Sequence, residues 1–181
     1  WQATGRELRI IDYVEERGKD LHYFAHLLKE RRTYLYGEHL FPHDMAVTEW
    51  TQTETRLEIA ERLGLTPAYT AEKMSLEDSI DATRRIFGSL VIDKIKGAGF
   101  LQAVRSYKYE WDDKKHTFGK VPVHDGASHG ASALRTLAVA YQEGRMHFHG
   151  TRDERRPEER YAKTAFARLG PFAQGGRERR P

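Results

Sequence analysis

The chain has 181 residues, a formal net charge of +3 at pH 7 and no cysteine. This length fits one domain with its own hydrophobic core, and the lack of cysteine excludes disulfide scaffolds, thiolate zinc sites and cysteine nucleophiles. No apolar run approaches the roughly 20 residues that a membrane-spanning helix needs, and no signal-peptide pattern opens the sequence.

The first part of the chain is predicted to alternate strands with helices. Residues 7–16 are rich in β-branched and aromatic side chains up to Gly18, which favours a strand. Apolar residues at helical spacing predict a helix at about 20–33. Residues 35–43 are predicted to form a short strand that Pro42 ends, because proline cannot donate a hydrogen bond to a neighbouring strand.

The same alternation continues in the middle of the chain. Residues 53–63 predict a second helix, which ends at Gly64, and residues 67–72 predict another short strand. Ser75, followed three residues later by Asp78, predicts the N-terminal cap of a third helix.

The last predicted elements are a strand, two helices and a hairpin. We expect the strand at 89–92, the fourth helix at 97–106 and the fifth at 128–142. Residues 107–118 are expected to form a hairpin that turns at 112–115. This order of elements implies a largely parallel sheet covered by helices, which is the α/β class.

Basic residues are in excess only near the end of the chain. Residues 1–142 hold 20 Lys and Arg against 21 Asp and Glu, whereas residues 143–181 hold 10 against 6. We therefore expect one domain at 1–142 and a basic, partly disordered tail at 143–181. Such a tail attracts nucleic-acid phosphates through counterion release, although a solvated chain end without a function has the same composition.

Asp44 is the first candidate for a functional side chain. It is predicted to lie at the carboxyl end of the strand at 35–43, where ligands bind in open α/β sheets. Carboxylate oxygens at such a position suit a divalent cation such as Mg²⁺. The alternative is that Asp44 only caps the turn that follows the strand.

The second candidate is the segment that opens the fifth helix. It combines acidic, imidazole and small side chains, and His129 and Ser132 are three residues apart, so both lie on one face of the first turn. The small residues around them let a phosphate or another backbone approach closely. The alternative is an ordinary helix N-terminus in which Asp125 and Ser128 compete as caps.

Other motifs carry less information. Tyr107, Tyr109 and Trp111 alternate along the hairpin and either stack on nucleic-acid bases or pack against the hairpin itself. His147 and His149 are either a metal-binding pair or two surface residues. The sequence has no Gly-x-x-x-x-Gly-Lys-Ser/Thr motif, so the chain is not itself an ATPase.

Four segments, in this order, resemble the C-terminal nuclease domain of tailed-phage large terminases. They are Ile11-Asp12-Tyr13-Val14-Glu15, Leu40-Phe41-Pro42-His43-Asp44, Ser75-Leu76-Glu77-Asp78-Ser79-Ile80 and His124-Asp125-x-x-Ser128-His129-Gly130-Ala131. The resemblance covers about residues 5–142. It implies an RNase H-like fold related to RuvC-type resolvases, with a mixed sheet flanked by helices. It also implies hydrolysis of concatemeric double-stranded DNA with two Mg²⁺ or Mn²⁺ ions.

The resemblance implies catalytic roles for Asp44, Asp125, His129 and Ser132, and metal binding by the first three. Asp44 matches the second acid of the family. The third acid falls either at Ser132, where relatives carry aspartate, or at Asp125, with His129 as a neutral nitrogen ligand. Because serine cannot replace a carboxylate charge, the implied domain is either an active endonuclease or a degenerate module that still binds DNA.

The resemblance also implies what surrounds the domain. The first acid of the family lies on an opening strand, which we expect to precede Trp1. The implied partners are an N-terminal packaging ATPase domain, a small terminase subunit, the portal protein and double-stranded DNA, without a membrane. The implied location is the cytoplasm of an infected bacterial host.

A His-Asp metal phosphohydrolase is the third hypothesis. His43-Asp44 and His124-Asp125 suggest it, because this class binds metal through such pairs. The class is all-helical, so the strands expected at 7–16 and 35–43 disfavour it.

Overall fold

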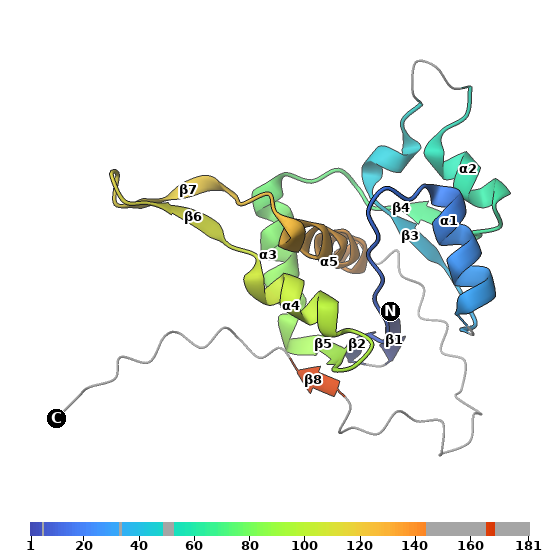
Figure 1. The fold of residues 1–181 in the computed structure, drawn as a ribbon, viewed down its shortest axis with the longest axis horizontal. Coiled ribbons are helices and arrows are strands. Elements are labelled where there is room, and N and C mark those ends of the chain that lie inside the picture. Colours follow the sequence, from blue (N-terminus) through green and yellow to red (C-terminus); the bar gives the residue numbers. More distant parts are fainter. Residues whose placement is uncertain (5, 33, 49–52, 144–165, 169–181) are drawn as a thin grey trace. The chain divides into compact units, whose positions relative to one another are not determined.

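The computed structural model describes two compact units, each of which is considered by itself (Figure 1). Described residues are 1–4, 6–32, 34–48, 53–143 and 166–168. The first unit contains Trp1–Val14, Thr83–Ala131 and the described residues of His147–Pro181. The second contains Glu15–Ala82 and the described residues of Ser132–Met146.

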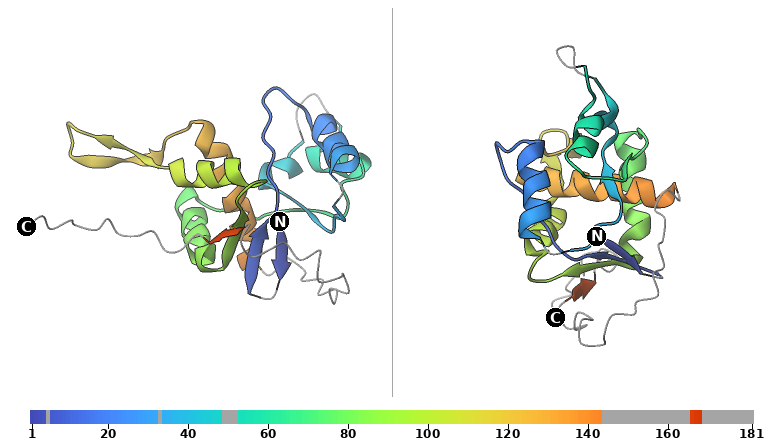
Figure 2. Two further views of the ribbon diagram at one scale, coloured as in Figure 1. Left: turned by 60° about the horizontal axis from the view of Figure 1, so that its bottom comes forward. Right: turned by 90° about the vertical axis from the view of Figure 1, so that its right-hand side faces the viewer.

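A four-stranded mixed sheet forms the centre of the first unit. The strand order is β1 (Gln2–Thr4), β2 (Glu7–Ile10), β5 (Leu90–Asp93) and β8 (Phe166–Arg168). The pair β2–β5 is parallel, and the two outer pairs are antiparallel; Figure 2 shows β1 and β2 side by side. Leu8 and Leu90 are paired and fully buried, as is Ile92, so burial of this apolar run stabilises the pairing.

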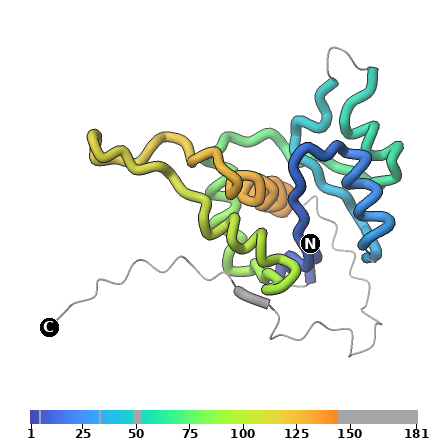
Figure 3. The backbone as a smooth tube through the Cα atoms, viewed as in Figure 1, coloured from blue at the N-terminus to red at the C-terminus, as the bar shows by residue number. Residues whose placement is uncertain are grey.

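Helices and a hairpin complete the first unit. They are the end of α3 (Leu76–Ile86), a 3₁₀ turn (Phe87–Ser89), α4 (Ala98–Ser106), β6 (Tyr109–Asp112), β7 (Thr117–Pro122) and the start of α5 (Gly126–Gln142). Phe100, Ala103 and Val104 are buried at helical spacing on α4. The hairpin β6–β7 projects away from α4 and leads directly into α5 (Figure 3).

The second unit has a small parallel sheet and several helices. Its elements are α1 (Leu21–His26), which continues as a π-helix (Leu27–Arg31), then β3 (His39–Phe41), a 3₁₀ turn η2 (His43–Ala46), α2 (Arg56–Arg62), β4 (Ala68–Thr70), the start of α3 and most of α5. Strands β3 and β4 pair in parallel. Ala25, Ala60 and Leu65 are buried in a cluster against which Phe41 and Met45 pack, so this core supports the chain on both sides of Pro42.

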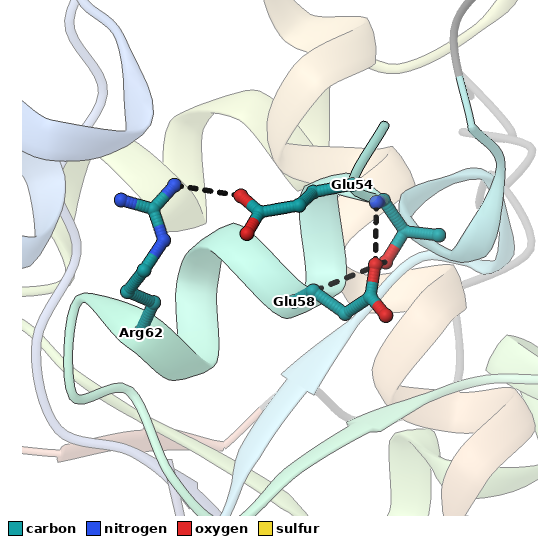
Figure 4. A network of polar contacts seen from close by, with 4 residues as sticks. Glu54, Glu58 and Arg62 are labelled. Carbon is teal, nitrogen blue, oxygen red and sulfur yellow. Dashed lines mark hydrogen bonds and ion pairs between the residues drawn. The ribbon is translucent and has the colours of Figure 1, made fainter. Parts of the chain in front are cut away.

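Helix α2 begins with a capping box (Figure 4). The Thr55 hydroxyl oxygen accepts a hydrogen bond from the Glu58 backbone N–H at 3.1 Å, and the Glu58 carboxylate accepts one from the Thr55 N–H at 2.7 Å. These two bonds satisfy N–H groups that have no partner inside the helix. Hydrogen bonds from the Thr55 backbone and side chain lower the pKa of Glu58. Arg62, the last residue of α2, forms an ion pair at 2.8 Å with Glu54, which precedes the cap.

We expect the Thr55→Ala variant to lose about 1 kcal/mol of unfolding free energy, because the cap hydroxyl is removed. The lowered pKa of Glu58 contributes stability above its ordinary value of 4.5, and this contribution is lost as the pH falls through the lowered pKa. Urea unfolding at several pH values measures both effects. Glu61→Ala, an exposed change on the same helix, is the control; equal losses in both variants would contradict the capping role.

The α/β class and all five predicted helices are confirmed, but the largely parallel sheet is wrong. The described strands form three separate sheets, and only β2–β5 and β3–β4 are parallel. The strand expected at 7–16 ends at Ile10, and the strand expected at 35–43 covers only His39–Phe41. Strand β3 ends together with β4, and β2 ends at Ile10, whose partner Ile92 is the last residue of β5 in this pairing, because unpaired backbone gains no ladder hydrogen bonds.

The predicted tail is described only at β8, which adds a strand beside β5; the rest of 144–181 lies outside the described residues. The proposed boundary at residue 142 and the RNase H-like topology stay predictions. Among the described residues, no helix combines the length and the apolar character needed to cross a membrane.

Candidate functional site

Asp44 lies in the 3₁₀ turn η2, directly after β3. Pro42 has an extended backbone and its carbonyl accepts a hydrogen bond from the Met45 N–H at 3.1 Å, so the chain turns immediately after the strand. The Asp44 side chain is exposed, and its carboxylate makes no hydrogen bond or ion pair with any described residue. The alternative role of capping this turn is therefore not seen in the described part of the chain.

The neighbouring strand determines where β3 ends. The His39 N–H donates to the Pro67 carbonyl at 2.8 Å, and the Ala71 N–H donates to the Phe41 carbonyl at 2.9 Å. The two strands thus run in parallel and end together, which places Asp44 just beyond the carboxyl edge of the pair. The predicted position of Asp44 at the carboxyl end of this strand is confirmed, whereas ligand binding at this edge stays a prediction.

His39 lies at the opposite, amino end of β3 and carries no positive charge there at pH 7. Its ring is half-buried and stacks on Tyr36 with ring centroids 5.7 Å apart. Burial lowers the pKa of His39, so the imidazole is neutral at pH 7.

Asp125 directly precedes helix α5, which begins at Gly126, two residues earlier than predicted. Its carboxylate Oδ1 accepts a hydrogen bond from the Ala127 N–H at 2.9 Å, and its carbonyl accepts one from the Ser128 N–H at 3.0 Å. The capping alternative is thus confirmed for Asp125, whereas the Ser128 hydroxyl donates back to the Asp125 carbonyl at 2.7 Å. The cap uses one carboxylate oxygen of an exposed side chain.

His129 and Ser132 lie one turn apart on α5. His129 is exposed, and its ring lies edge-on to His124 with centroids 5.8 Å apart. Ser132 is half-buried, and its hydroxyl oxygen accepts a hydrogen bond from Arg135 at 2.9 Å. At the position where the resemblance expects an acid, the chain thus presents a neutral group that contacts a cationic side chain.

The predicted site residues belong to both units. Asp125 and His129 are in the first unit, together with His124, whereas Asp44 and Ser132 are in the second. No group of three or more His, Asp or Glu side chains suited to hold a metal ion is found among the described residues. The two-ion centre therefore stays a prediction. His147 and His149, the other possible metal pair, lie outside the described residues.

The small residues near His129 have a packing role. A Cβ atom added to Gly130 would lie 2.7 Å from the Ala103 Cβ and 3.2 Å from the Tyr13 hydroxyl oxygen. Helices α4 and α5 therefore approach each other closely at this point. The element that approaches the backbone closely at Gly130 is therefore α4. This contact anchors the first turns of α5.

We expect Gly130→Ala to lower the unfolding free energy by about 1–3 kcal/mol, because the added methyl group overpacks the contact with α4. Gly99→Ala is the matched control on α4, since its Cβ would meet the Tyr13 ring at an ordinary 3.4 Å. This control should be neutral or stabilising by up to about 1 kcal/mol, because alanine favours a helix over glycine. Thermal unfolding of both variants measures the difference, and a destabilised Gly99→Ala with an unchanged Gly130→Ala would refute it.

Aromatic side chains on the hairpin are less buried than packing alone predicts. Trp111 is 44 % exposed and Phe118 is 61 % exposed, and their rings contact each other across the two strands. A register irregularity between Tyr109 and Trp111 interrupts the expected alternation. Tyr107 and Tyr109 remain half-buried, so base stacking by this face stays a prediction.

No protein-family model, no curated protein and no solved structure matches this chain. The likeness to phage terminases consequently depends on the four sequence segments alone.

Proposed function

We propose that this chain is part of the nuclease domain of a tailed-phage large terminase, with an RNase H-like fold, which cuts concatemeric double-stranded DNA during genome packaging. The proposal is supported by four motifs in the family's order and by the environment of Asp44. This carboxylate follows a parallel strand pair, is exposed and has no partner among the described residues. A carboxylate of this kind is available to a divalent cation.

The donor atoms suit Mg²⁺ or Mn²⁺. Asp44 would supply carboxylate oxygens, Asp125 the oxygen that does not accept from Ala127, and His129 an imidazole nitrogen. Carboxylates suit both ions, and the nitrogen donor favours Mn²⁺. When bound, a pair of such ions activates water and stabilises the leaving oxygen of the phosphodiester.

The proposed function implies several partners. The domain would act behind an N-terminal packaging ATPase domain, with a small terminase subunit and a portal protein, in the cytoplasm of the infected host. The basic residues of 143–181 would bind DNA phosphates without regard to sequence. Binding of this kind weakens steeply as salt is added.

A DNA-binding module without nuclease activity is the second candidate, and Ser132 favours it. The Ser132 hydroxyl carries no charge and accepts a hydrogen bond from Arg135. It therefore provides no anionic oxygen for a metal ion. In this case the domain would hold DNA, and another chain or domain would cut it.

Plasmid DNA distinguishes the two candidates. The intact-length protein is incubated with supercoiled plasmid in Mn²⁺, Mg²⁺ or EDTA, and binding is measured in parallel at rising salt concentration. Nicked and linear products that require metal support the nuclease. Salt-sensitive binding without products supports the module, and the absence of both binding and cleavage contradicts both candidates.

A further inference from the structure

Two histidines lie together at the start of α5. The rings of His124 and His129 are 5.8 Å apart at their centroids with an interplanar angle of 73°, and both side chains are exposed. A metal ion lies about 2.0–2.1 Å from an imidazole nitrogen, hence about 3.2 Å from the ring centroid. Two rings on one ion are thus about 4.5–6.4 Å apart as the angle at the ion opens from 90° to 180°. The observed separation falls within this interval.

The hydrogen bonds around Ser128 orient His124. Ser128 is 6 % exposed, and its hydroxyl has a single hydrogen, which it donates to the Asp125 carbonyl at 2.7 Å. The same oxygen lies 3.0 Å from Nδ1 of His124. We assign Nδ1 of His124 as the donor in this contact, because the hydroxyl hydrogen is directed to the Asp125 carbonyl. With Nδ1 as the donor, the lone pair of the His124 ring lies on Nε2.

A hydrogen bond of this kind is typical of metal-binding histidines. The ring nitrogen that does not bind the metal usually donates to an oxygen, which fixes the tautomer and the direction of the ring. Ser128 supplies that oxygen from a buried position, so His124 is held without prior binding. His129, in the first turn of α5, supplies the second nitrogen.

We propose that His124 and His129 bind one divalent transition-metal ion of the Zn²⁺ type through nitrogen, with Ser128 as the positioning residue of His124. The inference adds a ligand, His124, to the proposed metal centre, and its role in DNA cleavage rests on that proposed function. Metal binding itself requires neither Asp44 nor DNA. Water or the carboxylates of the proposed centre would fill the remaining coordination positions, since the described residues alone gather no group of three His, Asp or Glu ligands.

Nitrogen-resolved NMR of the full chain tests the proposal. Spectra of imidazole nitrogens are recorded at about pH 8, above the ordinary histidine pKa of about 6.5, during titration with Zn²⁺. We expect His124 to be protonated on Nδ1 before metal is added. The Nε2 signal of His124 and a ring nitrogen of His129 should then shift together along one binding curve.

Variants separate this site from other histidines. His124→Gln and His129→Gln should each weaken Zn²⁺ binding at the remaining ring at least tenfold, and Ser128→Ala should weaken binding by about 10–100-fold, as loss of an orienting partner does. His26→Ala is the control, because His22 and His26 are exposed and four residues apart on α1. It should leave the titration of His124 and His129 unchanged.

Three results would overturn the proposal: an Nε2-protonated His124, separate binding curves for the two rings, or undiminished binding at one ring after loss of the other. Backbone amide spectra verify that each variant is folded. Failure here, with metal-dependent cleavage intact, would refute only the histidine pair. Zn²⁺ binding without cleavage would refute only the nuclease.

Discussion

Asp44→Asn is expected to lower metal-dependent DNA cleavage by at least about a hundredfold, since even the loss of a partner behind a metal ligand costs 10–100-fold. Asparagine keeps the shape of the side chain but removes its charge. The unfolding free energy should remain unchanged, because the Asp44 carboxylate makes no hydrogen bond or ion pair with the described residues. Initial rates of plasmid nicking at several Mn²⁺ concentrations, together with urea unfolding, measure both quantities.

Asp113→Asn is the matched control for this change. Asp113 is exposed in the turn of the hairpin β6–β7, and its carboxylate likewise has no described partner. Both variants lose one surface charge, so any difference in their cleavage rates reports the loss of a metal ligand at Asp44. Equal cleavage by Asp44→Asn and the unaltered chain, or equal losses in the two variants, would remove Asp44 from the proposed centre.

Ile92→Ala is expected to destabilise the chain by about 2–5 kcal/mol, the usual cost of emptying a buried aliphatic site. Ile92 is fully buried in β5, where its backbone pairs with Ile10 of β2. A Cβ atom added to Gly97 would lie only 2.8 Å from the Ile92 Cγ2. The turn after the strand is therefore packed against this side chain.

Urea unfolding measures this loss against Ile95→Ala. Ile95 is 81 % exposed three residues further on, so the same deletion there should change stability by no more than about 0.5 kcal/mol. Similar values for the two variants would show that β5 is not the centre of the first unit.

Local signals predicted the helices well. Ser75 and Asp78 form the expected cap of α3, since the Ser75 hydroxyl oxygen accepts from the Asp78 N–H at 3.0 Å and donates to its carboxylate at 2.7 Å. The hairpin turns at the expected residues, and the Asp112 carboxylate accepts from the Lys114 N–H at 3.0 Å. These bonds join residues close in sequence, so their pattern is visible without the fold.

Strand lengths and sheet membership depend on distant residues and were not predictable in the same way. Residues 11–16 have strand-forming side chains, yet β2 ends at Ile10, where its pairing with Ile92 of β5 stops. The chain turns away directly after β5, where the Asp93 carboxylate accepts hydrogen bonds from the N–H groups of Ile95 and Lys96. A pattern of side chains along one segment carries no information about the length of its partner.

The candidate site was predictable only in part, for the same reason. Proline before Asp44 indicated a strand end, and the structure has one there. The contact between His124 and Ser128 was missed, although their spacing of four residues at a helix start was a visible signal. The engagement of Ser132 by Arg135 depends on side-chain directions along α5, which composition does not reveal.

Anomalous diffraction from crystals of this chain grown with Mn²⁺ is the most direct test of whether Asp44 binds metal. The nuclease proposal predicts an anomalous peak within coordination distance, about 2.1 Å, of an Asp44 carboxylate oxygen. The peak should disappear in crystals of Asp44→Asn. Crystals in which Mn²⁺ occupies other positions while the Asp44 carboxylate remains bare would contradict the proposal.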